Sequence, residues 1–329
     1  MTALTRNRFA WAIVAGLAFA AAAALLAPMI GSRFIGWQSW PGDSGGTVEQ
    51  QIFHTLRLPR VLLGLVVGAT LAMSGAAMQG WLRNPLASEY TLGISSGAAF
   101  VALLAGETAL ASVPGGVPVA GMIGGLTAIG LVWALARRRG GLAPGDTVLT
   151  GITVSLLFSA LTIIALNKVA STRAVHVVRW LTGGLDTAGY DALRQCAPWC
   201  AVSMVILMAA SRDLHQLAAG EDLAATRGVR VGRAQLLTLL GASLGTAAAV
   251  SVCGPIGFVG LIVPHCVRLL TGPDARLALP ISALAGAGFL ALCDGAARYF
   301  SRPEELPVGV ITATIGGPFF LWLLRARRN

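Results

Sequence analysis

Residues 234–267 read AQLLTLLGASLGTAAAVSVCGPIGFVGLIVPHCV, and none of these 34 residues is Asp, Glu, Lys or Arg. An α-helix crosses the hydrocarbon core of a bilayer with about 20 residues, within a range of about 17–25. The run is therefore too long for one crossing. Gly254-Pro255-Ile256-Gly257 lies inside it, and Gly and Pro interrupt helices. We expect one ordinary membrane-spanning helix before this break and one short helix after it.

Eight further stretches lack these four charged residue types, and each predicts one more crossing. They are Phe9–Ser32, Val61–Leu82, Tyr90–Gly106, Thr108–Ala136, Thr147–Asn167, Gln195–Ser211, Leu277–Cys293 and Leu306–Leu324. The longest of them contains Pro114-Gly115-Gly116, which trims it to one helix starting near Val117. Charged residues make up 12% of the chain, whereas a soluble protein carries about 25%. The sequence therefore predicts a single all-α membrane domain over residues 1–329 with ten transmembrane helices.

The basic residues predict the orientation of these helices. If the N-terminus is cytoplasmic, the inside loops and tails hold 15 of the 24 Lys and Arg residues, and the outside segments hold 9. This bias agrees with the positive-inside rule. Both termini are then cytoplasmic, the longest inside loop is 211–233, and the segment 168–194 lies outside. The net charge of +10 reports orientation here, and we expect no nucleic-acid partner.

The motifs for chemistry argue against an enzyme. Lys168 is the only lysine and follows Leu166-Asn167, whereas a P-loop requires Gly-x-x-x-x-Gly-Lys-Ser/Thr. Any ATP hydrolysis must come from another chain, and we expect no cofactor, metal site or catalytic residue in this one. Ion coupling is the alternative, because ion-driven carriers place ionisable residues within their spans. Asp294 and His265 are the two candidates near spans.

The inside loop 211–233 has features of a docking surface. Gly220 separates two short predicted helices, and Gly228 closes the second. Glu221 and Asp222 open the second helix, where acidic side chains interact favourably with the helix dipole. We interpret the loop as a rigid knob that contacts a partner, with an ordinary solvated linker as the alternative.

Seven motifs, in order along nearly the whole chain, are similar to those of a known family. They are Leu56–Arg60 (LRLPR), Gly75–Gln79 (GAAMQ), Arg83–Ala87 (RNPLA), Leu92–Ala98 (LGISSGA), Arg179–Leu185 (RWLTGGL), Gly257–Leu270 (GFVGLIVPHCVRLL) and Glu305–Ala313 (ELPVGVITA). On these motifs the chain resembles the permease family of ABC importers for ferric siderophores, haem and cobalamin.

The resemblance implies a type II importer fold in the bacterial inner membrane. It implies a second permease subunit, in a homodimer or a dimer of two similar chains, with the substrate path at the interface. Two ATP-binding cassette subunits, which carry ATP and Mg, would dock inside, and a periplasmic binding protein would deliver the chelate. The loop corresponding to 211–233 is the family's coupling segment. Its candidate contact residues here are Leu217, Gly220, Glu221, Asp222, Arg227 and Gly228.

Two further sites follow from the resemblance. The family narrows its cytoplasmic exit between helices four and five, which corresponds to Leu142, Ala143 and Pro144. Family members often have small hydroxyl residues there, so a plain turn is the alternative. Arginines matching Arg57, Arg60 and Arg298 would receive glutamates of the binding protein. The alternative for these three is contact with lipid phosphates, since long basic side chains extend to the membrane surface.

Taken with the resemblance, the sequence predicts ATP-driven uptake of a metal chelate by alternating access. Ferric siderophore, haem and cobalamin fit the sequence about equally. An ion-coupled secondary transporter is the alternative function.

Overall fold

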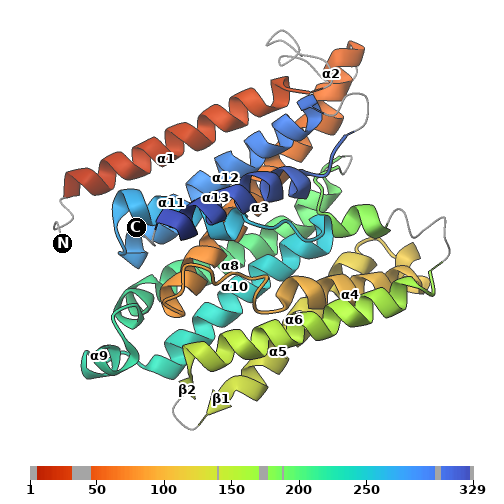
Figure 1. The fold of residues 1–329 in the computed structure, drawn as a ribbon. Coiled ribbons are helices and arrows are strands. Elements are labelled where there is room, and N and C mark those ends of the chain that lie inside the picture. Colours follow the sequence, from red (N-terminus) through yellow and green to blue (C-terminus); the bar gives the residue numbers. More distant parts are fainter. Residues whose placement is uncertain are drawn as a thin grey trace.

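The computed structural model describes residues 6–31, 46–138, 141–169, 177–186, 189–300 and 305–326 (Figure 1). Seven helices in this part are long and apolar enough to cross a membrane, and three shorter ones are also apolar. This agrees with an all-α membrane protein. The structure adds a two-residue antiparallel hairpin, β1 (Arg137–Arg138) and β2 (Gly141–Leu142).

The helices follow the apolar stretches of the sequence closely. The long ones are α1 (Arg6–Leu26), α3 (Leu58–Trp81), α5 (Gly116–Ala136), α6 (Pro144–Leu166), α8 (Asp191–Leu217), α10 (Val231–Cys253) and α12 (Ala275–Phe300). The three others are α4 (Ile94–Gly106), α11 (Val259–Thr271) and α13 (Val308–Ala326). The short elements are η1 (Ala27–Met29), α2 (Val48–Ile52), a π-helical turn η3 (Phe53–Arg57), η4 (Ala109–Ser112) and α9 (Glu221–Thr226).

The predicted break in residues 234–267 is confirmed. Helix α10 ends at Cys253 and α11 begins at Val259. Gly254 has a φ of 68°, which favours glycine, and Phe258 also has a φ of 68°. The segment 168–194 contacts this break, because the Gly184 N–H donates to the Cys253 carbonyl at 2.8 Å. The Gly309 N–H of α13 donates to the Gly183 carbonyl at 3.0 Å. The remainder of 168–194 includes residues 170–176 and 187–188, which lie outside the described residues.

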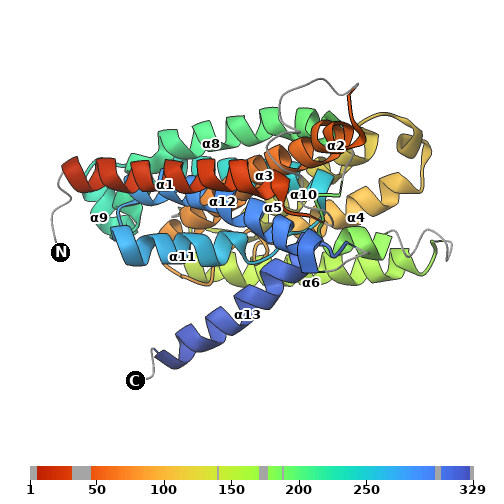
Figure 2. The same cartoon turned by 90° about the horizontal axis from the view of Figure 1, so that it is seen from above.

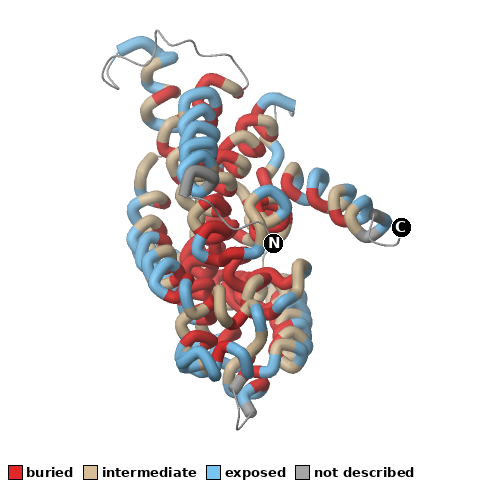
Figure 3. The backbone as a smooth tube through the Cα atoms, turned by 90° about the vertical axis from the view of Figure 1, so that its left-hand side faces the viewer, coloured by how far each residue is buried: buried red, intermediate tan, exposed pale blue. Residues whose placement is uncertain are grey.

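Helices α3, α10 and α12 are the most buried of the seven long helices, and Figure 3 shows the buried residues gathered in the middle of the bundle. The apolar window that contains α3 is 78% buried, whereas that of α1 is 6% buried. Glycine allows the closest contacts, since small residues let helix backbones approach one another in membranes. A Cβ on Gly97 would lie 2.7 Å from the Gly124 carbonyl oxygen, so α4 and α5 could not pack as they do with any larger residue there.

The two ends of the bundle carry different elements. The start of α1, the end of α13 and α9 lie at one end, and α2 lies at the other (Figures 1 and 2). Helix α13 diverges from the rest of the bundle towards its C-terminus (Figure 2). The start of α1 and the end of α13 thus lie at the same end of the bundle.

Candidate functional site

The segment 211–233 forms a knob, and its structure differs in one respect from the prediction. Residues 211–217 continue the spanning helix α8 and do not form a separate short helix, so that part of the prediction is wrong. The apolar pattern ends near Ser211, but Leu214 and Leu217 are buried, and their packing extends the helix. Gly220, with a φ of 124°, turns the chain into α9.

The predicted contact residues in and around α9 lie in two different environments. Asp222, Arg227 and Gly228 are exposed. Leu223 beside them exposes 51% of its surface, and the Arg227 Nη1 donates to Gln216 Oε1 at 2.6 Å. In contrast, Leu217 is buried and Glu221 is half-buried. Only part of the predicted set can therefore touch another protein directly.

Glu221 is connected to the predicted gate through a residue that the sequence did not single out. The Gln235 Nε2 donates to Glu221 Oε1 at 3.1 Å and to the Leu142 carbonyl at 3.2 Å. The Leu142 N–H donates in return to Gln235 Oε1 at 3.1 Å. Gln235 and Leu142 are buried, and Ala143 is exposed. Gln235 is the second residue of the charge-free run 234–267. No other feature of the sequence distinguished it.

A cavity of about 430 Å³ brings the two predicted cytoplasmic sites together. The cavity is lined by Ala143 and Pro144, by residues 219–223 and by Arg83. Pro144 occupies the first turn of α6, a position that suits proline because its missing N–H is not needed there. Helix α6 thus begins three residues before the predicted apolar stretch, at the predicted gate. The roles of these residues as gate and coupling contacts stay predictions.

At the other end of the bundle, the three predicted docking arginines are buried. The Arg60 Nη2 lies 2.8 Å from Asp294 Oδ1, and Arg60 also pairs with Glu305. The Arg298 Nε lies 3.1 Å from Asp294 Oδ2. Asp294 is fully buried between the two guanidinium groups. We call Arg60, Asp294, Arg298 and Glu305 the outer ion-pair network.

Arg57 donates to backbone carbonyls of η1. Its Nη1 donates to the Pro28 carbonyl at 3.0 Å and to the Met29 carbonyl at 3.2 Å. Arg57, Arg60 and Arg298 are therefore not exposed in the way that direct contact with a binding protein or with lipid phosphates requires. A carboxylate of another protein can reach Arg60 only by displacing Asp294 or Glu305. Their role in docking stays a prediction, and it requires a rearrangement of these contacts.

Glu89 is a buried acid that the sequence analysis overlooked. It lies between α3 and α4, directly before the stretch Tyr90–Gly106, and is completely buried. Burial raises the pKa of its carboxyl from 4.5 to about 7. Gly260 of α11 lies against it, since a Cβ there would come within 2.5 Å of a carboxyl oxygen. A lone charge at the edge of an apolar stretch was the signal that could have revealed it.

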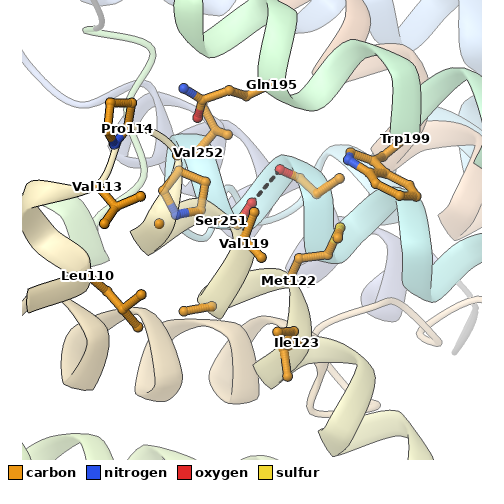
Figure 4. Close-up of a pocket in the computed structure, with 15 residues that line it drawn as sticks. Leu110, Val113, Pro114, Val119, Met122, Ile123, Gln195, Trp199, Ser251 and Val252 are labelled. Atoms are coloured by element: carbon orange, nitrogen blue, oxygen red, sulfur yellow. Dashed lines mark hydrogen bonds between the residues drawn. The ribbon is translucent and has the colours of Figure 1, made fainter. Parts of the chain in front are cut away.

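Two cavities lie within the helical bundle. One of about 290 Å³ is lined by hydroxyl groups from the segment before α4, from α4 and from α6, namely Tyr90, Ser95, Ser96, Ser155, Ser159 and Thr162. The Ser96 and Ser155 hydroxyls bond to each other at 3.3 Å. Another of about 590 Å³, between the η4–α5 region, α8 and α10, has only Gln195 and Ser251 as polar side chains (Figure 4). Neither cavity has a charged lining residue.

The structure offers no evident metal site in the part of the chain that it describes. No three His, Cys, Asp or Glu side chains there come close enough together to hold a metal ion. His265 is buried, and its ring lies 6.3 Å from that of Phe319. Asp294, the other candidate for ion coupling, pairs with Arg60 and Arg298 in the outer ion-pair network.

Comparison with known proteins places the chain in a family. The model of the FecCD transport family matches residues 12–326. The chain is 46% identical to the cobalamin import system permease protein BtuC of Halobacterium salinarum, covering 84% of this chain and 74% of that protein. It is 37% identical to the Fe(3+) dicitrate transport system permease protein FecD of Escherichia coli, covering 92% and 95%.

A solved structure agrees with this result. An inward-facing structure of a metal-chelate type ABC transporter superposes with a TM-score of 0.82 and 29% identity, covering 96% of this chain and 99% of that one. These relatives are transport permeases, not enzymes. With ten apolar helices in the described ranges and a family match over almost its entire length, the chain is a multi-pass membrane protein and belongs to the FecCD transport family.

Proposed function

We propose that this chain is the permease subunit of an ATP-driven importer for a metal chelate, either a ferric siderophore, haem or cobalamin. The observation that carries the proposal is its similarity to permeases for cobalamin and for iron dicitrate over most of their lengths. The sequence has no P-loop, so ATP and Mg would bind to two partner ATPase subunits. This chain would need no cofactor of its own.

The proposed topology has ten crossings in a single permease domain of the bacterial inner membrane. The termini and the knob formed by α8, α9 and α10 would be cytoplasmic. The arginine residues of these loops support a cytoplasmic position for the termini and the knob, because basic residues favour cytoplasmic loops. The segment 168–194 and the start of α3 would face the periplasm and the binding protein.

A second permease subunit is part of the proposal. Helix α6 exposes Leu149, Leu156 and Ile163, which repeat every seven residues and so lie along one side of the helix. Helix α13 exposes Leu321 and Trp322. These apolar surfaces suit contact with another copy or with membrane lipid. Alternating access at such a dimer interface would carry the chelate.

Neutral hydroxyl groups suit the proposed substrate path. The cavity with Ser96 and Ser155 offers hydrogen bonds to a polar chelate without the strong binding of a metal ligand or a charge. A substrate that must leave again is best held weakly. We assign this cavity to the polar wall of the path.

Uptake into liposomes tests the function directly. The permease, its cognate ATPase and its binding protein are reconstituted, and labelled ferric siderophore, haem and cobalamin are compared. The proposal expects uptake of one of them that requires ATP and persists when ionophores remove all ion gradients. Uptake that is independent of ATP and stops with an ionophore would support the ion-coupled alternative.

A further inference from the structure

The buried amide of Gln235 joins two parts of the chain that are distant in sequence. Helix α9 contributes Glu221, and the β-hairpin contributes Leu142, 79 positions earlier. A primary amide can donate two hydrogen bonds and accept others. Gln235 uses both donors and its acceptor here, at 3.1–3.2 Å.

The bond to Leu142 fixes backbone rather than a side chain. The N–H and the carbonyl of Leu142 both bond to the Gln235 side-chain amide. This amide therefore satisfies both backbone hydrogen-bonding groups of Leu142, as a neighbouring β-strand would. Gln235 is 1% exposed, and hydrogen bonds shielded from water are costly to break without replacement. Leu142 therefore cannot move away from α10 independently.

A displacement of Leu142 passes directly into α6. Ala143 follows Leu142 and is the N-cap residue of α6. The Thr147 N–H donates to the Ala143 carbonyl at 2.9 Å. Proline at position 144 fixes its own φ angle, which makes the joint stiff. The hairpin and the first turn of α6 thus form one rigid unit.

From this arrangement we propose that Gln235 is the positioning residue that transmits movement of α9 to the cytoplasmic start of α6. The inference rests on the proposed function, in which α9 contacts the ATPase. When the ATPase displaces α9, Glu221 pulls the Gln235 amide, and the amide shifts the backbone at Leu142. The cavity between α9 and Ala143 provides the space for this movement.

Removal of the amide tests the proposal. In the reconstituted complex, Gln235→Leu keeps a similar shape but loses all three hydrogen bonds. We expect ATP-driven chelate uptake to fall at least about tenfold, while the complex still assembles and hydrolyses ATP at its basal rate. The control is Thr226→Val, which removes an exposed hydrogen bond to the Leu223 carbonyl on the same knob and should leave uptake within about twofold.

A pair of swapped residues separates transmission from a merely structural role. Gln235→Glu places a carboxylate beside Glu221 and removes the donor to the Leu142 carbonyl, so uptake should fall. Adding Glu221→Gln restores a donor between the two positions, and uptake should recover several-fold relative to the single variant. This comparison remains decisive if Gln235→Leu does not fold.

The outcomes distinguish this inference from the proposed function. Wild-type complex without ATP-driven uptake contradicts the proposed function. If the wild type transports, uptake within twofold of wild type in Gln235→Leu overturns the role of Gln235. A double variant that transports no better than Gln235→Glu alone overturns it as well.

Discussion

The outer ion-pair network near the start of α3 and the knob around α9 each gather charged residues, but these residues differ in burial and pairing. In the outer ion-pair network, Arg60 and Arg298 are buried and compensated by Asp294. In the knob, Asp222 and Leu223 are exposed, whereas Glu221 accepts a hydrogen bond from the buried Gln235. The first arrangement suits internal structure, and the second leaves a surface that another protein can contact.

The comparison corrects an inference from charge alone. Basic residues near the outside of a membrane protein suggest docking or lipid contact, but both need exposed side chains. Burial with an internal acid is a third possibility, and in the outer ion-pair network it holds α3 against α12. Charge reversal of Arg60 would therefore destabilise the fold, and a loss of binding in that variant would not demonstrate docking.

The largest effect is expected for Asp294→Asn, which leaves two buried guanidinium groups without their shared carboxylate. Removal of one partner from a buried ion pair costs about 3–5 kcal/mol of unfolding free energy. The measurement is denaturant-induced unfolding of the purified protein in detergent.

Glu305→Gln provides the matched control in the same network. Glu305 also pairs with Arg60, but 38% of its side chain is exposed, so its loss should cost only about 0–1 kcal/mol. Equal effects of the two variants would show that burial does not decide the strength of this network.

A smaller, pH-dependent effect is expected for Glu89→Gln. Below pH 4.5 the carboxyl is protonated in both the folded and the unfolded chain, and burial carries no ionisation cost. As the pH rises, the unfolded chain loses this proton first, so stability falls until about pH 7, where the folded carboxyl also ionises. The glutamine variant should avoid this loss, which amounts to about 3 kcal/mol.

The measurement is the difference in thermal stability between Glu89→Gln and wild type at pH 5 and pH 8. The variant's advantage should be small at pH 5 and larger at pH 8. A constant difference between these pH values would mean that the Glu89 carboxyl titrates normally.

The smallest effect on stability is expected at the knob. Reversing Glu221 and Asp222 to Lys should abolish the stimulation of ATP hydrolysis by the loaded binding protein in liposomes. Asp222→Lys alone, which touches only the exposed surface, should change the unfolding free energy by no more than about 0.5 kcal/mol. Unchanged stimulation in the double variant would argue against a coupling role for α9.

The sequence predicted the helices well because their signal is local. Charge-free runs report spans, and Gly254-Pro255 reports the break before α11. It predicted α9 because Gly220 and Gly228 mark its turns, but it did not predict that α8 continues to Leu217. It could not predict the pairing of Arg60 with Asp294, 234 positions apart, because such pairing depends on which helices pack together. The link from Glu221 through Gln235 to Leu142 was unpredictable for the same reason.

Crosslinking from the knob tests the central claim that this surface receives an ATPase. A photoreactive amino acid replaces Leu223 in cells that contain the whole transporter, and Leu270, which is exposed at the end of α11, serves as the comparison position. The account predicts a strong adduct between position 223 and the ATPase subunit, and a much weaker one from position 270. An adduct from 223 with the binding protein, or no protein adduct at all, would contradict it.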